Sequence, residues 1–224
     1  MSLIVKRNVK EYNRVYSLGQ NHKYPNLNLV RVQKKYFINS YGKVLDFGCG
    51  SGENSIFLSK CGYKVFSLDA ADQALKVVKK KNQRLKNKLK IILFSDSKKL
   101  PFKNNFFDYI VCLSVISLLG SKKNIQKLIK EFRRVLKPGG KLVIDINAPK
   151  GDFIKGAHVN KKSYTYYSLK SKKNKNLIKI YNCKSKKDFL NFFKGFQVDD
   201  IGEIFFRYLD FNDHEFLALM KKDS

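Results

Sequence analysis

Short apolar runs alternate with longer amphipathic segments through the first two thirds of the chain. Five of the runs have the β-branched and aromatic composition of buried strands and lie at 43–47, 63–69, 90–96, 106–116 and 141–147. Apolar residues at helical spacing fill the segments 54–62, 72–86 and 124–137. Because strands and helices alternate, the sequence predicts an α/β fold: a doubly wound, mostly parallel, Rossmann-like sheet with helices on both faces.

The last part of the chain adds two strands to these five. Residues 187–195 read as a helix, and 196–210 and 214–222 read as strands that pair as a hairpin, which makes a seven-stranded sheet with an antiparallel last strand. The segment 150–194 is poor in aliphatic residues and reads as an insertion after strand 5, either a surface lid or short strands. Residues 1–42 are predicted to form a helical extension.

No linker rich in Pro, Gly or Ser divides the 224 residues. We therefore expect a single domain, 1–224. Its expected parts are the extension 1–42, a ligand-binding core 43–149, the insertion 150–194 and the C-terminal strands 195–224.

The candidate chemistry begins where the first predicted strand ends. Gly48, Gly50 and Gly52 alternate directly before a helix. Glycine lets the backbone turn sharply and approach a ligand, and a helix N-terminus presents unpaired N–H groups, so a polar or anionic ligand is expected. A nicotinamide-type G-x-G-x-x-G pattern would place its third glycine at Glu53, so the spacing disfavours a dinucleotide. Asp69 ends the second strand, where such folds bind ribose hydroxyls.

The run VLDFGCGSG at 44–52 resembles the first motif of class I S-adenosylmethionine-dependent methyltransferases. The resemblance extends to Asp69, to Asp96 after strand 3, and to LKPGGKLVIDIN at 136–147. It implies S-adenosylmethionine as cofactor, with the glycine loop on its methionine part, Asp69 on its ribose, Asp96 on its adenine amino group, and Leu113 and Ser114 near the sulfonium. The cofactor residues implied around these positions are Asp46, Gly48, Cys49, Gly50, Gly52, Asp69, Ala70, Ser95, Asp96, Ser97, Leu113 and Ser114.

The segment HKYPNLNLVRVQKKYF at 22–37 also resembles a piece found ahead of the sheet in some small-molecule and sugar methyltransferases. By that resemblance Arg31 would pair with the cofactor carboxylate and Tyr24 would cover the cofactor, against the alternatives of a solvated arginine and a tyrosine that packs under the extension. In the LPF…FD stretch before strand 4, Leu100, Pro101, Phe106 and Asp108 are expected to pack rather than to do chemistry.

Acceptor-side residues are sought at the carboxyl end of strand 5, the edge where open parallel sheets bind ligands. Asp145 and Asn147 lie there, and His158 follows in the insertion, so these three are the predicted catalytic residues. His22 and His214 are the other residues that titrate near neutrality, and a structural role competes for each. Tyr164, Tyr166 and Tyr167 would stack on an acceptor or pack against the body.

Charge leaves more than one function open. The chain carries 46 Lys and Arg against 18 Asp and Glu, a net charge of +28, and only 7 of the cations are Arg. The excess of Lys is read either as the composition of an A/T-rich genome or as an electrostatic footprint.

Three functions follow from these readings. The first is methyl transfer to oxygen or nitrogen of a small molecule such as a sugar or nucleotide-linked metabolite, where a basic rim suits an anionic acceptor. The second is an RNA methyltransferase that grips phosphates with the insertion, and the third is a catalytically silent, cofactor-binding scaffold. The four cysteines have no metal-ligand spacing and no apolar run is long enough to span a membrane, so we expect a cytoplasmic protein without a metal.

Overall fold

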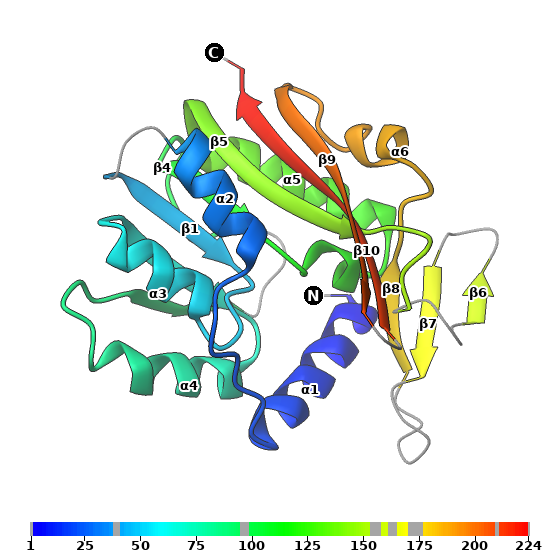
Figure 1. The fold of residues 1–224 in the computed structure, drawn as a ribbon, viewed down its shortest axis with the longest axis horizontal. Coiled ribbons are helices and arrows are strands. Elements are labelled where there is room, and N and C mark those ends of the chain that lie inside the picture. Colours follow the sequence, from blue (N-terminus) through cyan, green and yellow to red (C-terminus); the bar gives the residue numbers. More distant parts are fainter. Residues whose placement is uncertain are drawn as a thin grey trace.

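The computed structural model describes residues 2–37, 41–94, 99–152, 158–160, 165–169, 177–208 and 211–223. Of 158–160, 165–169, 177, 208 and 211 it describes the backbone alone. Its main feature is a seven-stranded sheet in the order β3-β2-β1-β4-β5-β10-β9 (Figure 1). The strands β1 to β5 are parallel, and β10 is antiparallel to both β5 and β9. The predicted fold class is confirmed, including the antiparallel last strand.

The strands of this sheet lie close to the predicted runs. They are β1 (Lys43–Phe47), β2 (Lys64–Asp69), β3 (Lys90–Leu93), β4 (Phe107–Cys112), β5 (Leu136–Asn147), β9 (Phe196–Tyr208) and β10 (Phe211–Lys222). The Pro-Gly-Gly run of LKPGGKLVIDIN lies inside β5: Phe107 pairs with Leu136 and Tyr109 with Lys141, so residues 137–140 loop out opposite Asp108.

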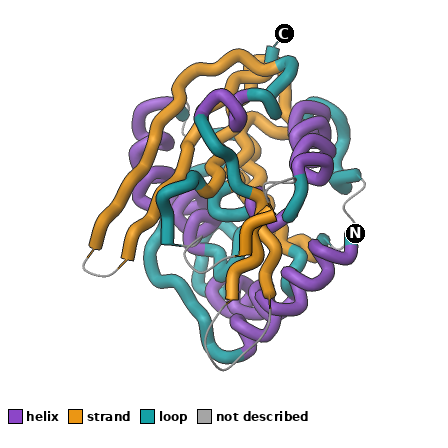
Figure 2. Tube along the Cα trace, turned by 90° about the vertical axis from the view of Figure 1, so that its right-hand side faces the viewer, coloured by secondary structure: helices purple, strands orange, loops and turns teal. Residues whose placement is uncertain are grey.

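Helices cover both faces of the sheet (Figure 2). They are α1 (Leu3–Ser17), α2 (Leu27–Tyr36), α3 (Glu53–Lys60), α4 (Asp72–Asn82), the short 3-10 helix η1 (Ile116–Leu119), α5 (Lys122–Val135) and α6 (Lys186–Leu190). Alternate residues of the strands decide the faces, since Val44 packs with α2, α3 and α4, whereas Leu45 packs with α5 and α6. The helical extension predicted before the sheet is confirmed as α1 and α2.

The segment 150–194 differs from its prediction in its last part. It forms a separate small sheet of β6 (His158–Asn160), β7 (Thr165–Leu169) and β8 (Leu177–Tyr181). Ile180 of β8 and Phe189 of α6 are fully buried, and Phe189 packs in the main apolar cluster. This part of the segment therefore belongs to the core, because most of its described large apolar side chains are buried.

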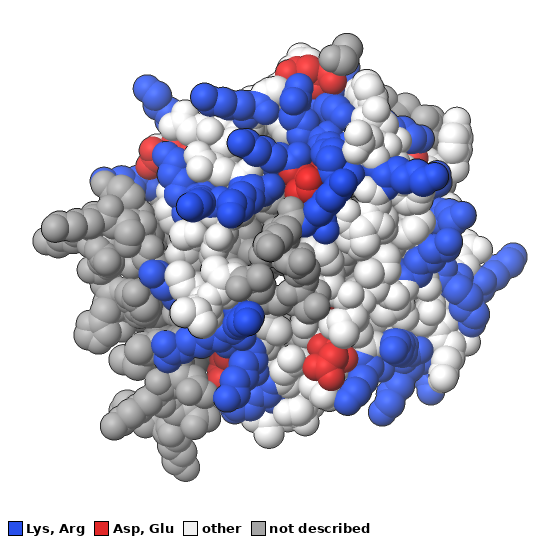
Figure 3. Space-filling model, turned by 180° about the vertical axis from the view of Figure 1, so that it is seen from behind, with Lys and Arg blue, Asp and Glu red and all other residues white. Residues whose placement is uncertain are grey.

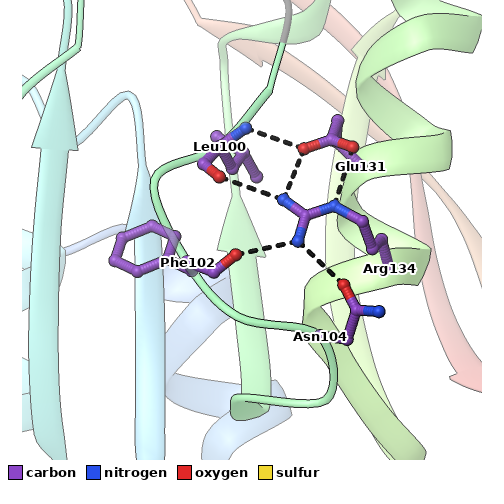
Figure 4. Close-up of polar contacts among 5 residues, drawn as sticks. All are labelled: Leu100, Phe102, Asn104, Glu131 and Arg134. Carbon is purple, nitrogen blue, oxygen red and sulfur yellow. Dashed lines mark hydrogen bonds and ion pairs between the residues drawn. The ribbon is translucent and has the colours of Figure 1, made fainter.

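Arg134 fastens the loop before β4 to α5 (Figure 4). Its guanidinium donates to the carbonyl oxygens of Leu100 (3.0 Å) and Phe102 (2.8 Å) and to the side chain of Asn104 (3.0 Å), and it pairs with Glu131 (2.7 Å). Glu131 in turn accepts from the Leu100 N–H at 2.7 Å. The loop around Leu100 is therefore held in place by Arg134, because its planar guanidinium reaches several oxygen atoms at once.

Candidate active site

The loop between β1 and α3 is shaped by its glycines. The N–H groups of Gly48 and Cys49 both donate to the Leu68 carbonyl, at 2.7 and 3.1 Å, which draws the loop against the end of β2. Gly48 has a φ of +74° and Gly50 a φ of +53°, in the left-handed region that favours glycine. A Cβ would lie 2.3 Å from Val115 Cγ2 at Gly48 and 2.5 Å from the Tyr16 hydroxyl at Gly50. Both positions therefore need glycine for backbone and for space.

Asp69 organises the same loop from the end of β2. Its Oδ2 accepts from the Gly50 N–H and its Oδ1 from the Ala71 N–H, each at 2.8 Å. Burial raises the pKa of this carboxyl, and the backbone N–H groups that donate to it lower the pKa in part. Each oxygen keeps a further lone pair, so the carboxylate can still accept hydroxyl donors from a ligand.

A cavity of about 450 Å³ opens at the carboxyl ends of β1, β2 and β4. One wall is the glycine loop with Asp69 and Ala70. The other walls are largely apolar and comprise Val5, Val9, Phe47, Phe94, Leu113, Val115, Leu118 and Leu119. Although the chain has 46 Lys and Arg, none of the described residues that line this cavity is Lys or Arg.

Helix α1 forms one side of the cavity and lies below the arrowheads of the central strands in Figure 1. Asn8, 2% exposed, docks it: its Nδ2 donates to the carbonyls of Leu118 (2.6 Å) and Lys179 (2.8 Å). Tyr12 and Tyr16 lie one turn apart and both line the cavity. Burial and then the charge of Asp69 raise the pKa of Tyr12 to about 12, and the same two causes raise the pKa of Tyr16. Both phenols therefore stay protonated near neutral pH and can donate a hydrogen bond.

The linker 18–26 between α1 and α2 closes another side. Its backbone is tied to the glycine loop and α3, since the His22 N–H donates to Ser51 Oγ (3.1 Å) and the Asn26 N–H to Asn54 Oδ1 (2.9 Å). Lys81 of α4 donates to the carbonyls of His22 and Ser51 and pairs with Glu53. Gln20, His22 and Tyr24 of this linker line the cavity.

Comparisons with known proteins agree with this geometry. Residues 45–144 match the family model described as a methyltransferase domain. The chain is 34% identical to a demethylmenaquinone methyltransferase of Staphylococcus saprophyticus over 116 residues, 50% of this chain and 48% of that protein. It is 32% identical over 152 residues to the enzyme of the same name from Staphylococcus aureus strain JH9, covering 62% of this chain and 61% of the relative. The chain thus spans about half to three fifths of the length of these relatives.

A solved S-adenosylmethionine-dependent methyltransferase from Methanosarcina mazei superposes with a TM-score of 0.74, covering 90% of this chain and 99% of that one. At 17% identity, this likeness shows the shared fold. Residues 45–144 thus correspond to a methyltransferase domain, and the chain shares the fold of S-adenosylmethionine-dependent methyltransferases. S-adenosylmethionine is accordingly its cofactor.

The cavity of the methyltransferase domain fits that cofactor. The glycine loop and Asp69 line the cavity together, and the Asp69 carboxylate keeps lone pairs that can accept hydroxyl donors from a ligand. Of the predicted cofactor residues, Gly48, Cys49, Gly50, Asp69, Ala70, Leu113, Ser114 and Tyr24 line the cavity. Asp46 and Gly52 belong to the strand and the helix cap on either side of the loop. Ser95, Asp96 and Ser97 lie outside the described residues.

Arg31 is placed differently from its prediction. It lies on α2, is exposed, and is not among the described residues that line the cavity. Sequence reasoning also missed Val5, Asn8, Val9, Tyr12 and Tyr16 of α1. The only available signal for them was the amphipathic pattern of residues 3–17, which indicates a helix but not what the helix covers.

The acceptor-side residues predicted on β5 lie behind the cavity wall. Asp145, 2% exposed, accepts from the Ser114 N–H at 2.6 Å. Ser114 has a φ of +59°, so this bond holds a strained turn whose residue lines the cavity. Asn147 bonds to Ser117 through its backbone N–H and its side chain. Neither Asp145 nor Asn147 is among the described lining residues. Their hydrogen bonds instead hold Ser114 and Ser117 in place.

The three histidines have different surroundings. His214 is 3% exposed, with Nδ1 accepting from the Lys150 N–H (2.9 Å) and Nε2 beside Glu203 Oε1 (2.8 Å), so it joins β10 to β9 and to the turn after β5. His22 lines the cavity. The side chains of His158, Tyr166 and Tyr167 and the whole of Tyr164 lie outside the described part of the chain. Across the described residues no group of three or more His, Cys, Asp or Glu could hold a metal ion.

Asp46 makes the stability of the methyltransferase domain depend on pH. Burial, with a smaller contribution from the charge of Asp69, raises its pKa from 3.8 to about 7, although the Ser55 hydroxyl donates to it at 2.5 Å. The unfolded chain therefore loses this proton at lower pH than the folded chain. The folded state binds more protons between about pH 4 and pH 7, so the free energy of unfolding falls as pH rises through that window.

We expect Asp46→Asn to remove this contribution, because an amide keeps the contact with Ser55 and does not titrate. The slope of unfolding free energy against pH should become less negative by up to about 1.4 kcal/mol per pH unit. Urea denaturation at a series of pH values measures it. Asp72→Asn, at a half-exposed carboxyl on α4, is the control and should leave the slope unchanged. Equal slopes in Asp46→Asn and the parent chain would contradict the assignment.

Proposed function

We propose that this protein transfers a methyl group from S-adenosylmethionine to a small, uncharged and largely apolar acceptor. The observation that carries the proposal is the composition of the cavity: a polar cradle of glycines and Asp69 on one side and an apolar wall on the other. When bound, S-adenosylmethionine would supply a methyl group on a sulfonium: a nucleophile in line with the C–S bond would bond to the methyl carbon as that bond breaks, and the neutral thioether would leave. The protein then has chiefly to align the acceptor and exclude water.

The wall opposite the cradle indicates the acceptor class. Val5 and Val9 of α1 face the same cavity as Val115, Leu118 and Leu119. Such side chains favour apolar surface, and a phosphate in this position would lose water without gaining a cation, since no described lining residue is Lys or Arg. This supports an uncharged acceptor over a nucleotide-linked one. A quinone of the kind in the relatives' name, demethylmenaquinone, fits this description.

The cavity also holds the groups that could orient such an acceptor. The phenols of Tyr12 and Tyr16 remain protonated near neutral pH, and a phenol can donate a hydrogen bond to a carbonyl or hydroxyl oxygen on an otherwise apolar ring. If the acceptor must lose a proton, His22 is the described histidine that lines the cavity. These three residues all come from the first 24 of the chain, which supports acceptor recognition by α1 and the linker.

Methyl transfer from labelled S-adenosylmethionine to three acceptor sets tests the proposal. The sets are uncharged phenols and quinols with apolar side chains, nucleotide-linked sugars, and structured RNA. We expect label in the first set alone. Label in nucleotide sugars or RNA would refute the acceptor class, and calorimetric cofactor binding without label in any set would indicate a scaffold rather than an enzyme.

A further inference from the structure

The linker between α1 and α2 exposes apolar side chains beside the cavity. Among the described residues, three of the eight large apolar side chains that are exposed lie within ten positions: Leu18 (72% exposed), Tyr24 (81%) and Leu27 (66%). Between the two leucines lie Gln20, His22 and Pro25, which line the cavity. In Figure 1 this is the dark blue segment that runs from the lower end of α1 to α2. Exposed apolar groups that cluster in this way mark an interaction surface.

The charges around these side chains are almost all positive. Residues 2–37 contain eight Lys or Arg and a single acid, Glu11. Glu11 is 6% exposed and pairs with Arg14 at 2.5 Å, so it presents little charge to solvent. Lys10, Lys23 and Arg31 are exposed. A partner for this surface must therefore combine negative charge with an apolar layer that can receive leucine side chains.

We propose that Leu18 of the linker and Leu27 at the start of α2 dock this protein on the surface of an anionic lipid bilayer. Aliphatic side chains enter the boundary between headgroups and acyl chains, while flanking Lys and Arg attract anionic headgroups. Single-stranded RNA, the other polyanion that the net charge of +28 suits, is bound by stacking bases on aromatic rings. Of the three exposed side chains Tyr24 offers a ring, whereas Leu18 and Leu27 are aliphatic and suit a lipid. Among the described helices, none is long and apolar enough to cross a membrane.

Charge alone does not choose the docking face. Seen from behind, the molecule also presents many Lys and Arg and few acidic side chains over its described surface (Figure 3). Attraction to an anionic surface therefore acts on the molecule as a whole, and the exposed leucines decide which side faces the lipid. With the linker against the bilayer, the cavity opens beside the lipid, so an apolar acceptor can enter it without crossing water.

Sedimentation of the full chain with lipid vesicles tests this docking without any methyl transfer. One set of vesicles is phosphatidylcholine and the other an equimolar mixture of phosphatidylcholine and phosphatidylglycerol. We expect binding to the mixed vesicles, and we expect L18S combined with L27S to bind them at least about tenfold more weakly, because burial of leucine side chains is lost. V198S, at an exposed apolar side chain of β9 that is 42% exposed, is the matched control and should bind like the parent chain.

Neither leucine lines the cavity, and serine is tolerated at both sites, Leu18 after the end of α1 and Leu27 in the first turn of α2. Calorimetric cofactor binding and the unfolding midpoint should therefore be the same in all three proteins. Failure of cofactor binding would count against the proposed function and not against docking.

Three results would overturn the docking proposal. The double variant could bind vesicles as well as the parent does, or the parent could fail to bind the mixed vesicles. The double variant could also lose binding to RNA and keep binding to vesicles.

Discussion

Replacing Asp69 with asparagine is expected to weaken S-adenosylmethionine binding by about a hundredfold or more. The carboxylate accepts from two backbone N–H groups, of Gly50 and Ala71, and an amide offers an oxygen to only one of them. Its NH2 group would face the other N–H, donor against donor. Hydrogen bonds to a charged group contribute about 1.5–3 kcal/mol each, and the ligand loses its carboxylate acceptor as well.

Calorimetric titration with S-adenosylmethionine measures this loss. D72N is the matched control, because Asp72 is three positions further on, in the first turn of α4, and its side chain is 48% exposed and 3.9 Å from Lys76. It should bind the cofactor with unchanged affinity. If D69N bound as tightly as the parent chain, Asp69 would not contact the cofactor and its bonds to the loop would be structural alone.

Replacing Gly48 with alanine is expected to lower the free energy of unfolding by about 2–4 kcal/mol. Two costs add there. The φ of +74° is unfavourable for alanine, and the new Cβ would lie 2.3 Å from Val115 Cγ2 and 2.9 Å from Cγ1, in a wall of the cavity. Val115 directly follows Ser114, whose strained backbone is held by Asp145, so the wall has little freedom to retreat.

Gly139→Ala separates these two costs. Gly139 has nearly the same φ, +72°, but the nearest atom to a Cβ there is Lys221 Cε at 4.0 Å. This control should lose only the backbone contribution, about 1–2 kcal/mol, in urea denaturation. We also expect Gly48→Ala to bind S-adenosylmethionine more weakly, whereas Gly139→Ala should bind it normally. Equal destabilisation by the two substitutions would show that the contact with Val115 relaxes without cost.

Much of the fold was predictable because each strand and helix of a parallel α/β sheet has a recognisable pattern in its own stretch of sequence. Each strand of the core is a short apolar run, each helix has a 3.6-residue pattern, and the order of these elements leaves few topologies open. The glycines at 48, 50 and 52 and the acid at 69 were informative for a related reason. The glycines allow the left-handed backbone of the loop, and the acid accepts a hydrogen bond from a loop N–H group. Few other residue types can do either.

The segment 150–194 shows where composition misleads. Its many lysines and few aliphatic residues predict a surface element, yet Ile180 and Phe189 are fully buried. Average composition cannot tell which side of a short strand or helix is covered. In β8 and α6 the covered side is given by contacts with elements far away in the sequence, and those contacts decide that this part is core.

The sequence by itself determined the sheet, the glycine loop and the position of Asp69, since each of these depends on residues that are neighbours in the chain. Only the tertiary structure decided that α1 closes the cavity, that Asp145 holds the backbone of Ser114, and that no described lining residue of the cavity is Lys or Arg although the chain carries 46 of them. The physical reason is that an amphipathic pattern fixes which face of an element is buried, but packing across the whole chain selects what that face is buried against.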